Sequence, residues 1–444
     1  MAGNPDRPQA VLSVGIVSAE KLRFSFRTPY VFERQEFTGS HSASLSDGRI
    51  EFCGRVYDEI IFRHQGPESC FEIFDVTIGV GFHWNRQEAS QVFPDDLKIS
   101  VIDGRLTAIN IVGIENYLLS VISSEMSASC SRELLKAHAV ISRSWLLAQI
   151  SKSSLLSASQ TPYSACTDTP DELVRWYDRE DHKGYDVCAD DHCQRYHGLS
   201  RASTRAVREV IDETWGEVLK YDGAICDARF SKCCGGVLEQ FEYNWEPRHY
   251  DYLVALRDSP AESDFSDLTV EENARRWILS APEAFCNTSD PAILSQILTS
   301  FDRETLNFYR WKVEYTVEEL SRLVRERSGE DYGEILDLVP LARGTSGRIC
   351  RLQIVGSRKT KVIGKELEIR RTLSPTHLYS SAFVVEKTDG RFVLRGAGWG
   401  HGTGLCQIGA AVMGHQGYSY REILRHYFPS VEIGYICDIQ SPNI

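Results

Sequence analysis

Glu125 is the residue of this sequence that is best suited to proton transfer. It lies in the segment Ser124-Glu125-Met126, where one helical pattern ends and another begins shortly afterwards. A side chain at such a junction can project into a cleft without disturbing core packing. A carboxyl group in a partly closed apolar cleft can stay protonated near neutral pH and donate to a glycosidic oxygen. The local sequence alone favours a surface or capping residue, because glutamate is usually exposed.

A glycine-rich segment from Gly396 to Gln407 is the second candidate for chemistry. Its five glycines within nine residues allow positive φ angles and a close approach of backbone to ligand. His401 and Gln407 offer hydrogen bonds, and Trp399 offers a face for stacking on a sugar, although it could instead be a core residue under the loop. A phosphate-binding loop is the alternative. The segment lacks the Gly-Lys-Ser/Thr ending of a P-loop and no βαβ unit follows it, which argues against a nucleotide.

Cysteine and histidine residues gather between positions 182 and 197. His182, Cys188 and Cys193 supply the nitrogen and sulfur ligands that zinc prefers, but their spacing fits no common zinc finger. Buried thiols are therefore the alternative to a metal site. A separate pair, Cys233-Cys234, could place one thiol in a site and the other in the core.

The elements that must position these residues change along the chain. Short strand-like runs fill residues 10–110, and a helical period follows over Ile114–Met126. Ser131 is a suitable N-cap for a second helix that runs to about Ile150. A hairpin over Val218–Phe230 closes at Asp222-Gly223 and leads into the Cys233-Cys234 pair.

The second half of the chain is more charged. Residues 246–345 favour helices, most clearly Val317–Ser328, with Thr316 as N-cap and Glu319 three residues on. Strand patterns return further on, and two short helices end the chain before a final strand. The expected strands are Ile349–Val355, Glu366–Arg370, Phe383–Glu386 and Arg391–Leu394, and the expected helices are about Leu405–Gly414 and Tyr420–Phe428.

These elements predict an α+β protein in which a lobe of helices packs on antiparallel β-structure. The expected parts are a β-rich N-terminal region (1–100), a region that holds Glu125 (101–245), a charged helical insertion or second lobe (246–345) and a C-terminal part with the glycine-rich loop (346–444). A length of 444 residues is too great for one compact core.

Composition excludes some partners. The net charge of −13 disfavours nucleic acid, since the phosphate backbone repels such a chain. No apolar run reaches the roughly 20 residues that cross a bilayer. The segment from Met1 to Pro8 has no signal-peptide core, so location in the cell envelope, the periplasm or outside the cell requires that an export signal has been removed. The 13 cysteines, an odd number, leave buried thiols, a metal site or some disulfides open.

Several segments, taken together and in order, resemble the SpoIID/LytB family over about residues 100–260 and 315–435. The segment Tyr117 to Met126 and the segment Leu135 to Ser144 match the family's helix junction. The other matching segments are Cys193-Gln194-x-Tyr196-x-Gly198, Ser231 to Gly236, Gly398-Trp399-Gly400-His401-Gly402-x-Gly404-x-x-Gln407, and Ile423-Leu424 to Pro429.

The resemblance implies glycan cleavage in bacterial peptidoglycan. In this family a glutamate at the position of Glu125 is the proposed acid/base of a lytic transglycosylase, which leaves a 1,6-anhydro sugar. One carboxyl group suffices, because it protonates the leaving oxygen and then takes the proton of the sugar's own 6-hydroxyl. The resemblance further implies a structural zinc on His182, Cys188 and Cys193. The substrate-binding residues that it implies are Arg143, Gln194, Tyr196, Ser231, Trp399, His401 and Gln407. Because a polar substrate must be held from several sides, we also expect Glu125 and His401 to face one groove.

Some residues depart from the family pattern. Ser127 replaces a proline, which could loosen the loop after Glu125, and Leu405-Cys406 replaces Met-Ser. The family also includes amidase enhancers, so membership alone does not establish catalysis. A non-catalytic glycan-binding protein that promotes a partner amidase is the first alternative. A zinc- or thiol-dependent hydrolase centred on Cys188, Cys193 and Cys233 is the second.

Overall fold

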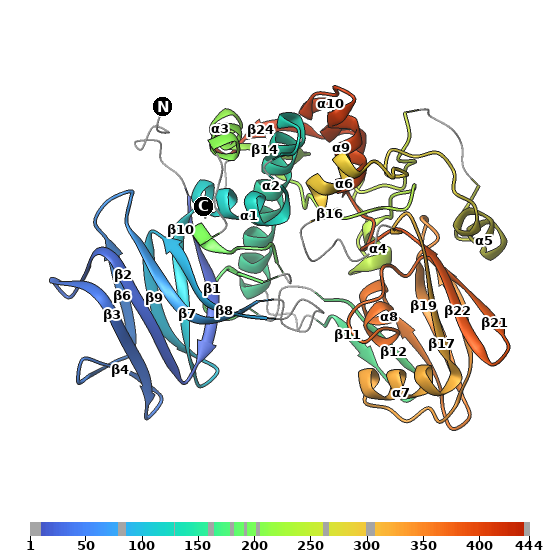
Figure 1. The fold of residues 1–444 in the computed structure, drawn as a ribbon, viewed down its shortest axis with the longest axis horizontal. Coiled ribbons are helices and arrows are strands. Elements are labelled where there is room, and N and C mark those ends of the chain that lie inside the picture. The colour runs from blue at the N-terminus through green and yellow to red at the C-terminus, as the bar shows by residue number, and fades with distance from the viewer. Residues whose placement is uncertain are drawn as a thin grey trace.

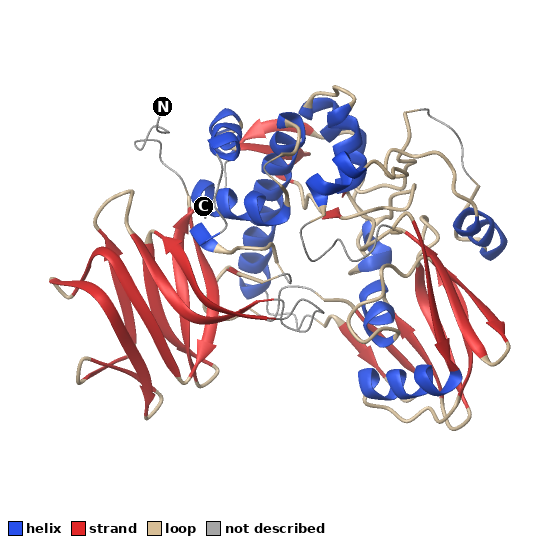
Figure 2. Cartoon of the chain, viewed as in Figure 1, coloured by secondary structure: helices blue, strands red, loops and turns tan. Residues whose placement is uncertain are grey.

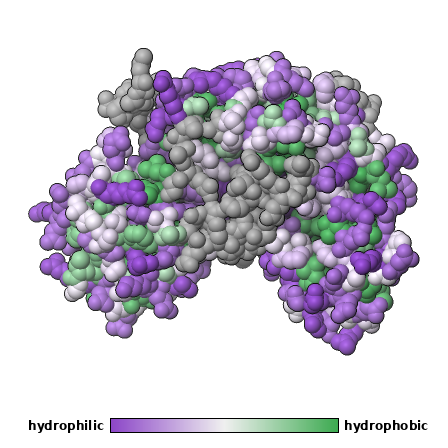
Figure 3. Space-filling view, viewed as in Figure 1, coloured by the Kyte–Doolittle hydropathy of each residue, from purple (hydrophilic) through white to green (hydrophobic). Residues whose placement is uncertain are grey.

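The α+β class predicted from the sequence is confirmed in the computed structural model of the chain (Figures 1 and 2). A β-sheet region and an α/β lobe flank a central group of helices. The space-filling view shows these two parts projecting on either side of a recess at the lower edge (Figure 3). The structure describes residues 10–78, 86–127, 129–158, 164–177, 182–190, 193–200, 205–260, 266–298 and 307–438.

The N-terminal region is an 11-stranded sheet whose strands lead directly into the first helix. Alternating residues of β2 (Lys21–Phe32) point inward, so that Phe24, Phe26 and Tyr30 pack with Phe62 in an aromatic core. The strand β13 (Val187–Cys188) joins the edge of this sheet by pairing in parallel with β1. The other strands are β1 (Val11–Ala19), β3 (Gln35–Ser46), β4 (Arg49–Phe52), β5 (Arg55–Tyr57), β6 (Glu59–His64), β7 (Cys70–Ile78), β8 (Arg86–Pro94), β9 (Asp96–Ile102) and β10 (Arg105–Gly113).

The central helices follow the predicted order. Helix α1 spans Ile114–Glu125, and α2 spans Arg132–Ala158, longer than the sequence indicated. The hydroxyl of Ser131 accepts a hydrogen bond from the N–H of Leu134, as expected for an N-cap. The predicted hairpin is confirmed as β14 (Glu217–Tyr221) and β15 (Ala224–Ile225). The remaining elements here are α3 (Arg205–Glu213), α4 (Phe241–Asn244), α6 (Pro291–Ile297), β16 (Phe230–Ser231), β23 (Leu405–Cys406), α9 (Gln407–His415), α10 (Tyr420–Tyr427) and β24 (Glu432–Tyr435).

The C-terminal lobe has two sheets and its own hydrophobic core. One sheet has the order β11-β12-β20-β19-β18, and the other has the order β17-β22-β21. Helix α7 (Val317–Ser328) begins at the predicted capping box of Thr316 and Glu319. The further elements are α5 (Glu271–Leu279), α8 (Glu366–Thr372), β11 (Cys166–Asp168), β12 (Glu172–Arg175), β17 (Arg310–Thr316), β18 (Ile335–Arg343), β19 (Ile349–Gly356), β20 (Thr360–Gly364), β21 (Phe383–Thr388) and β22 (Arg391–Ala397).

Two expectations for this lobe are corrected. The segment 246–345 is not only helical, because it contributes β17 and β18 to the two sheets. Residues Glu366–Arg370 form a helix rather than a strand. Glu366 and Arg370 lie one helical turn apart, and their side chains form an ion pair at 3.0 Å that supports the helix.

No helix in the described part of the chain is long and apolar enough to cross a membrane. All 13 cysteines of the sequence lie in the described residues, and each carries a free thiol.

Candidate active site

Glu125 is the last residue of α1, and its side chain is partly exposed. Ser124 and Met126 on either side are buried, so the carboxyl group emerges from a buried junction. Its Oε1 atom accepts a hydrogen bond of 3.4 Å from the backbone N–H of Arg195. The backbone of a segment 70 residues away thus orients the carboxyl group.

The loop after Glu125 is anchored. The backbone N–H of Ser127 donates to the carbonyl of Gln296 in α6 at 2.8 Å, and the thiol of Cys130 lies 3.3 Å from the same oxygen. A proline at position 127 would have no N–H for this bond. The replacement of proline by Ser127, which could have loosened the loop, instead provides a contact that holds it.

The segment 193–198 is fixed between α1 and α2 by buried side chains. The hydroxyl of Tyr117 donates to Oε1 of Gln194, and Nε2 of Gln194 donates to the carbonyl of Ser142. The ring of Tyr196 stacks on Tyr117 with centroids 5.0 Å apart, and its hydroxyl donates to Asn110. Gln194 and Tyr196 are 1% and 0% exposed, so in this structure they support the N–H donor of Arg195 rather than face a ligand.

Gln407 joins the same network from the far end of the chain. Its Nε2 atom lies 3.3 Å from Nε2 of His138, whose Nδ1 lies 3.2 Å from the hydroxyl of Ser142. Contacts therefore run from Gln407 through His138 and Ser142 to Gln194, whose neighbour Arg195 holds Glu125. The sequence did not single out His138. His138 and Ser142 are spaced one helical turn apart, and this spacing is the sequence feature that could have indicated their contact.

The glycine-rich loop is held against the strand that carries Ser231. Strands β16 and β23 pair in parallel, with Ser231 opposite Cys406. A Cβ atom on Gly400 would lie 3.0 Å from that of Ser231. The buried hydroxyl of Ser231 has no hydrogen-bond partner among the described residues, and its predicted contact with substrate stays a prediction.

His401 is held as a neutral ring. Its Nδ1 accepts a hydrogen bond from the N–H of Thr403 at 3.1 Å, and its ring packs edge-on against Trp245. Burial, together with the positive charges of Arg229 and Arg348, lowers the pKa of His401 well below its ordinary value. The side chain is still partly exposed, so it can offer a neutral imidazole to a ligand.

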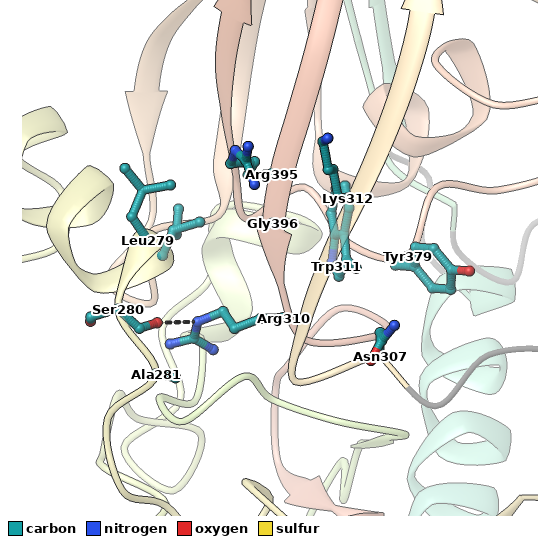
Figure 4. A pocket seen from close by; sticks show the side chains of 11 residues that line it. Leu279, Ser280, Ala281, Asn307, Arg310, Trp311, Lys312, Tyr379, Arg395 and Gly396 are labelled. Atoms are coloured by element: carbon teal, nitrogen blue, oxygen red, sulfur yellow. Dashed lines mark hydrogen bonds between the residues drawn. The ribbon is translucent and has the colours of Figure 1, made fainter.

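Trp399 is partly exposed and lies beside a small cavity. Its ring contacts those of Phe308 and Tyr379, with centroids 5.9 and 5.5 Å apart. The cavity has a volume of about 430 Å³. Figure 4 shows Arg310, Trp311 and Tyr379 among the residues that line it. The indole N–H of Trp311 donates to the carbonyl of Gly398, which ties the cavity wall to the loop.

Arg143 has its donors occupied by the protein. It is fully buried, and its guanidinium forms a two-pronged ion pair with Glu115 at 2.9 and 2.7 Å. A third donor binds the carbonyl of Glu217 at 2.8 Å. These contacts favour a structural role that joins α1, α2 and β14. A direct contact of Arg143 with substrate stays a prediction.

His182, Cys188 and Cys193 come together as the sequence predicted. Their ligand atoms lie within 4.8 Å of one another, and Nε2 of His182 is 3.0 Å from the sulfur of Cys193. One imidazole and two thiols at this separation fit a zinc ion. Cys188 belongs to β13, so the cluster lies where the segment that carries Arg195 leaves the N-terminal sheet.

Two family models match parts of the chain, and several known proteins are similar to it. A family model described as "Stage II sporulation protein" matches residues 102–221, and a model described as a domain of unknown function matches residues 239–404. The chain is 24% identical over 330 residues to the amidase enhancer of Bacillus subtilis, a match that covers 71% of this chain and 40% of that protein. It is also 24% identical over 328 residues to an uncharacterized protein of Brachyspira hyodysenteriae, covering 74% of this chain and 68% of that protein. Stage II sporulation protein D of Bacillus amyloliquefaciens is 21% identical over 323 residues, covering 72% of this chain and 74% of that protein. The chain thus spans less than half the length of the amidase enhancer.

Proposed function

Because the chain belongs to the SpoIID/LytB family, we propose that it acts in the bacterial cell wall and cleaves peptidoglycan glycan strands as a lytic transglycosylase, with Glu125 as the acid/base. The observation that carries this proposal is the placement of the Glu125 carboxyl group. It is partly exposed at the end of α1, and the N–H of Arg195 orients it.

One carboxyl group can perform both proton transfers. Protonated Glu125 gives its proton to the oxygen that links MurNAc C1 to GlcNAc, and the C1–O bond breaks. The carboxylate then removes the proton of the MurNAc 6-hydroxyl, whose oxygen bonds to C1. Glu125 regains its proton, no water is consumed, and the product ends in a 1,6-anhydro sugar.

The residues predicted to bind substrate divide into two groups by exposure. Trp399 and His401 are partly exposed, and we propose that they contact the glycan by stacking and by hydrogen bonding. Arg143, Gln194, Tyr196, Ser231 and Gln407 are buried, and we propose that they hold the catalytic junction and the glycine-rich loop in place. A single groove that includes both Glu125 and His401 remains part of the proposal.

We propose a structural role for a zinc ion on His182, Cys188 and Cys193, because Glu125 already supplies the proton chemistry; these residues provide three of its four ligands. It would fix the segment 182–198 against the N-terminal sheet, and this segment supplies the N–H donor to Glu125. Zinc can also act as a Lewis acid, but the proposed proton transfers require only Glu125.

The test is the mass spectrum of products from defined glycan strands. Wild-type protein should release fragments with 1,6-anhydroMurNAc ends, which weigh one water less than hydrolysed ends. Glu125→Gln should release none, and the exposed Glu318→Gln should behave like wild type. Hydrolysed ends, or equal cleavage by Glu125→Gln, would overturn the assignment.

A non-catalytic role is the second candidate, because one relative is named an amidase enhancer. In that case wild-type protein would bind glycan strands without shortening them. It would increase the release of stem peptides by an added cell-wall amidase, and Glu125→Gln would increase it equally.

A further inference from the structure

Four cysteine sulfurs from three distant parts of the chain meet in the core beneath the glycine-rich loop. Cys233 and Cys234 follow β16, Cys406 ends β23, and Cys286 lies after α5. The side chains of Cys286 and Cys406 contact each other and both members of the adjacent pair. All four residues are at most 2% exposed.

One sulfur pair of this cluster has the separation that a tetrahedral metal ion requires. A zinc–sulfur bond of about 2.3 Å gives sulfur–sulfur edges of about 3.8 Å in a regular tetrahedron. The sulfurs of Cys234 and Cys286 lie 3.6 Å apart. A disulfide would need about 2.05 Å. Cys234 and Cys286 are therefore too far apart for a disulfide and close to one edge of a zinc site, and the ligand atoms of Cys234, Cys286, Cys406 and the neighbouring Asp258 all lie within 4.8 Å of one another.

Backbone N–H groups donate hydrogen bonds to two of the sulfurs, as is expected around thiolate ligands. The N–H of Cys234 points at the sulfur of Cys406 at 3.2 Å, and the N–H of Gly236 points at the sulfur of Cys234 at 3.4 Å. Gly235 and Gly236 both have positive φ, and this turn brings the second N–H back to the sulfur. Outer hydrogen bonds of this kind orient metal ligands.

Charged groups complete the outer surroundings. Asp258 is fully buried, and one of its oxygens lies 3.4 Å from the sulfur of Cys234. Its two oxygens accept hydrogen bonds from the Tyr427 hydroxyl at 2.8 Å and the Cys286 N–H at 3.1 Å, which favours a place beside the metal ligands rather than among them. Two guanidinium groups offset the negative charge, since Arg348 donates to the carbonyl of Cys234 and Arg310 to that of Gly235.

We propose that Cys233, Cys234, Cys286 and Cys406 bind one Zn²⁺ ion as a closed structural site. Four protein ligands and complete burial leave no open position for substrate, which is the mark of a structural rather than a catalytic zinc. This site is separate from that of His182, Cys188 and Cys193, and it does not depend on glycan cleavage.

The ion would fix both ends of the glycine-rich loop. Cys233 exchanges two backbone hydrogen bonds with Trp399, at 2.7 and 3.0 Å, and Cys406 directly precedes Gln407. The fourth ligand, Cys286, belongs to the part of the chain that the second family model matches. The site would thus fasten residues 239–404 to the part of the chain that carries Glu125.

Elemental analysis of the purified full chain tests this proposal. Cys286→Ser should lower the zinc content by one equivalent per chain, whereas Cys226→Ser, which alters a buried thiol outside the cluster, should leave it unchanged. An unchanged zinc content in Cys286→Ser, or iron in place of zinc, would overturn the proposal.

A second measurement covers the case in which Cys286→Ser does not fold. Cys188→Ser removes a ligand of the other site and leaves all four cysteines of this cluster intact. Its zinc-edge X-ray absorption should show a shell of sulfur alone at about 2.3 Å. A zinc-free Cys188→Ser protein, a shell that contains nitrogen, or an intact mass lowered by two hydrogens through a disulfide would each contradict the site.

Discussion

The Nε2 atoms of His138 and Gln407 lie 3.3 Å apart in the core, although 269 positions separate the two residues in the chain. This contact joins the first turn of α9, directly after the glycine-rich loop, to α2. Because His138 also contacts Ser142, the loop and the junction that carries Glu125 share one buried polar network. Such a network is stable only while each member keeps its partner.

The first prediction concerns the rate of glycan cleavage. Glu125→Gln keeps the shape of the side chain but cannot exchange a proton, so glycan cleavage should fall by about 10²–10⁴-fold. The melting temperature should stay close to that of wild type, because the side chain is partly exposed. The initial rate of anhydro-product release measures this, with Glu318→Gln as the control. Retention of more than roughly a tenth of wild-type activity would contradict the acid/base role.

The second prediction concerns the buried ion pair. Glu115→Gln would leave the Arg143 guanidinium buried without its counter-ion and should cost about 3–5 kcal/mol of unfolding free energy. Glu209→Gln, which removes the exposed ion pairs of Glu209 with Arg205 and Arg132, should cost far less. Denaturant unfolding of both variants measures the difference. If both variants lose similarly little unfolding free energy, the ion pair of Glu115 with Arg143 does not support the junction.

The third prediction is a pH dependence from His138. Burial, together with the charge of Lys232, lowers the pKa of His138 to about 3. Below the unfolded-state pKa of about 6.5, the unfolded chain binds a proton that the folded chain does not, so stability falls as pH decreases. The loss from this one residue should reach about 2 kcal/mol at pH 5.

Unfolding free energies at pH 7 and pH 5 test this in wild type and His138→Gln. The variant should lose less stability on acidification than wild type does. His401 contributes in the same direction, because its pKa is also lowered, by burial and by nearby arginines. An identical pH response of His138→Gln and wild type would show that the ring is not held neutral.

Local patterns predicted the elements around Glu125 but not what they contact. The end of α1, the cap at Ser131 and the hairpin at Asp222-Gly223 depend on nearby residues, and all three are confirmed. The N–H of Arg195 reaches Glu125 only through folding of a distant segment. Local sequence does not encode such long-range contacts, so the donor could not be predicted.

The burial of individual side chains was the other feature that the sequence could not predict. Gln407 was expected to face a groove, yet it is 2% exposed against His138. Cys286 lies in a segment whose charge pattern indicated helices, and nothing in its local sequence pairs it with Cys406. Residues Ile335–Arg343 form the strand β18 instead of a helix because they pair with β19. This tertiary contact overrides the local propensity of the segment.

The fourth prediction concerns the zinc ligands beside β13. Cys188→Ser should remove one zinc equivalent per chain, lower the melting temperature and reduce cleavage, because the segment that supplies the Arg195 N–H would lose its anchor. Cys53→Ser, an exposed cysteine in the N-terminal sheet region, is the control. If the wild-type protein contains no metal and is only as stable as Cys188→Ser, His182, Cys188 and Cys193 do not form a zinc site.

The last prediction separates backbone strain from crowding in the glycine-rich loop. Gly402 and Gly390 have similar positive φ angles of 77° and 74°. A Cβ atom on Gly402 would lie 2.4 Å from Cζ of Arg348, whereas one on Gly390 would meet nothing within 4 Å. Arg348 is 1% exposed and donates to the carbonyl of Gly400, so it has no room to move away.

Alanine at either position should therefore lower the unfolding free energy by about 1–2 kcal/mol through backbone strain. Gly402→Ala should lose a further 1–3 kcal/mol, roughly, from overpacking. Only Gly402→Ala should also reduce glycan binding and cleavage, since displacement of Arg348 moves the backbone between Trp399 and His401. Unfolding free energies and glycan-binding affinities of the two variants measure this directly. If Gly402→Ala unfolds like Gly390→Ala and binds glycan like wild type, the loop is not positioned by Arg348, and its proposed contact with substrate loses its structural support.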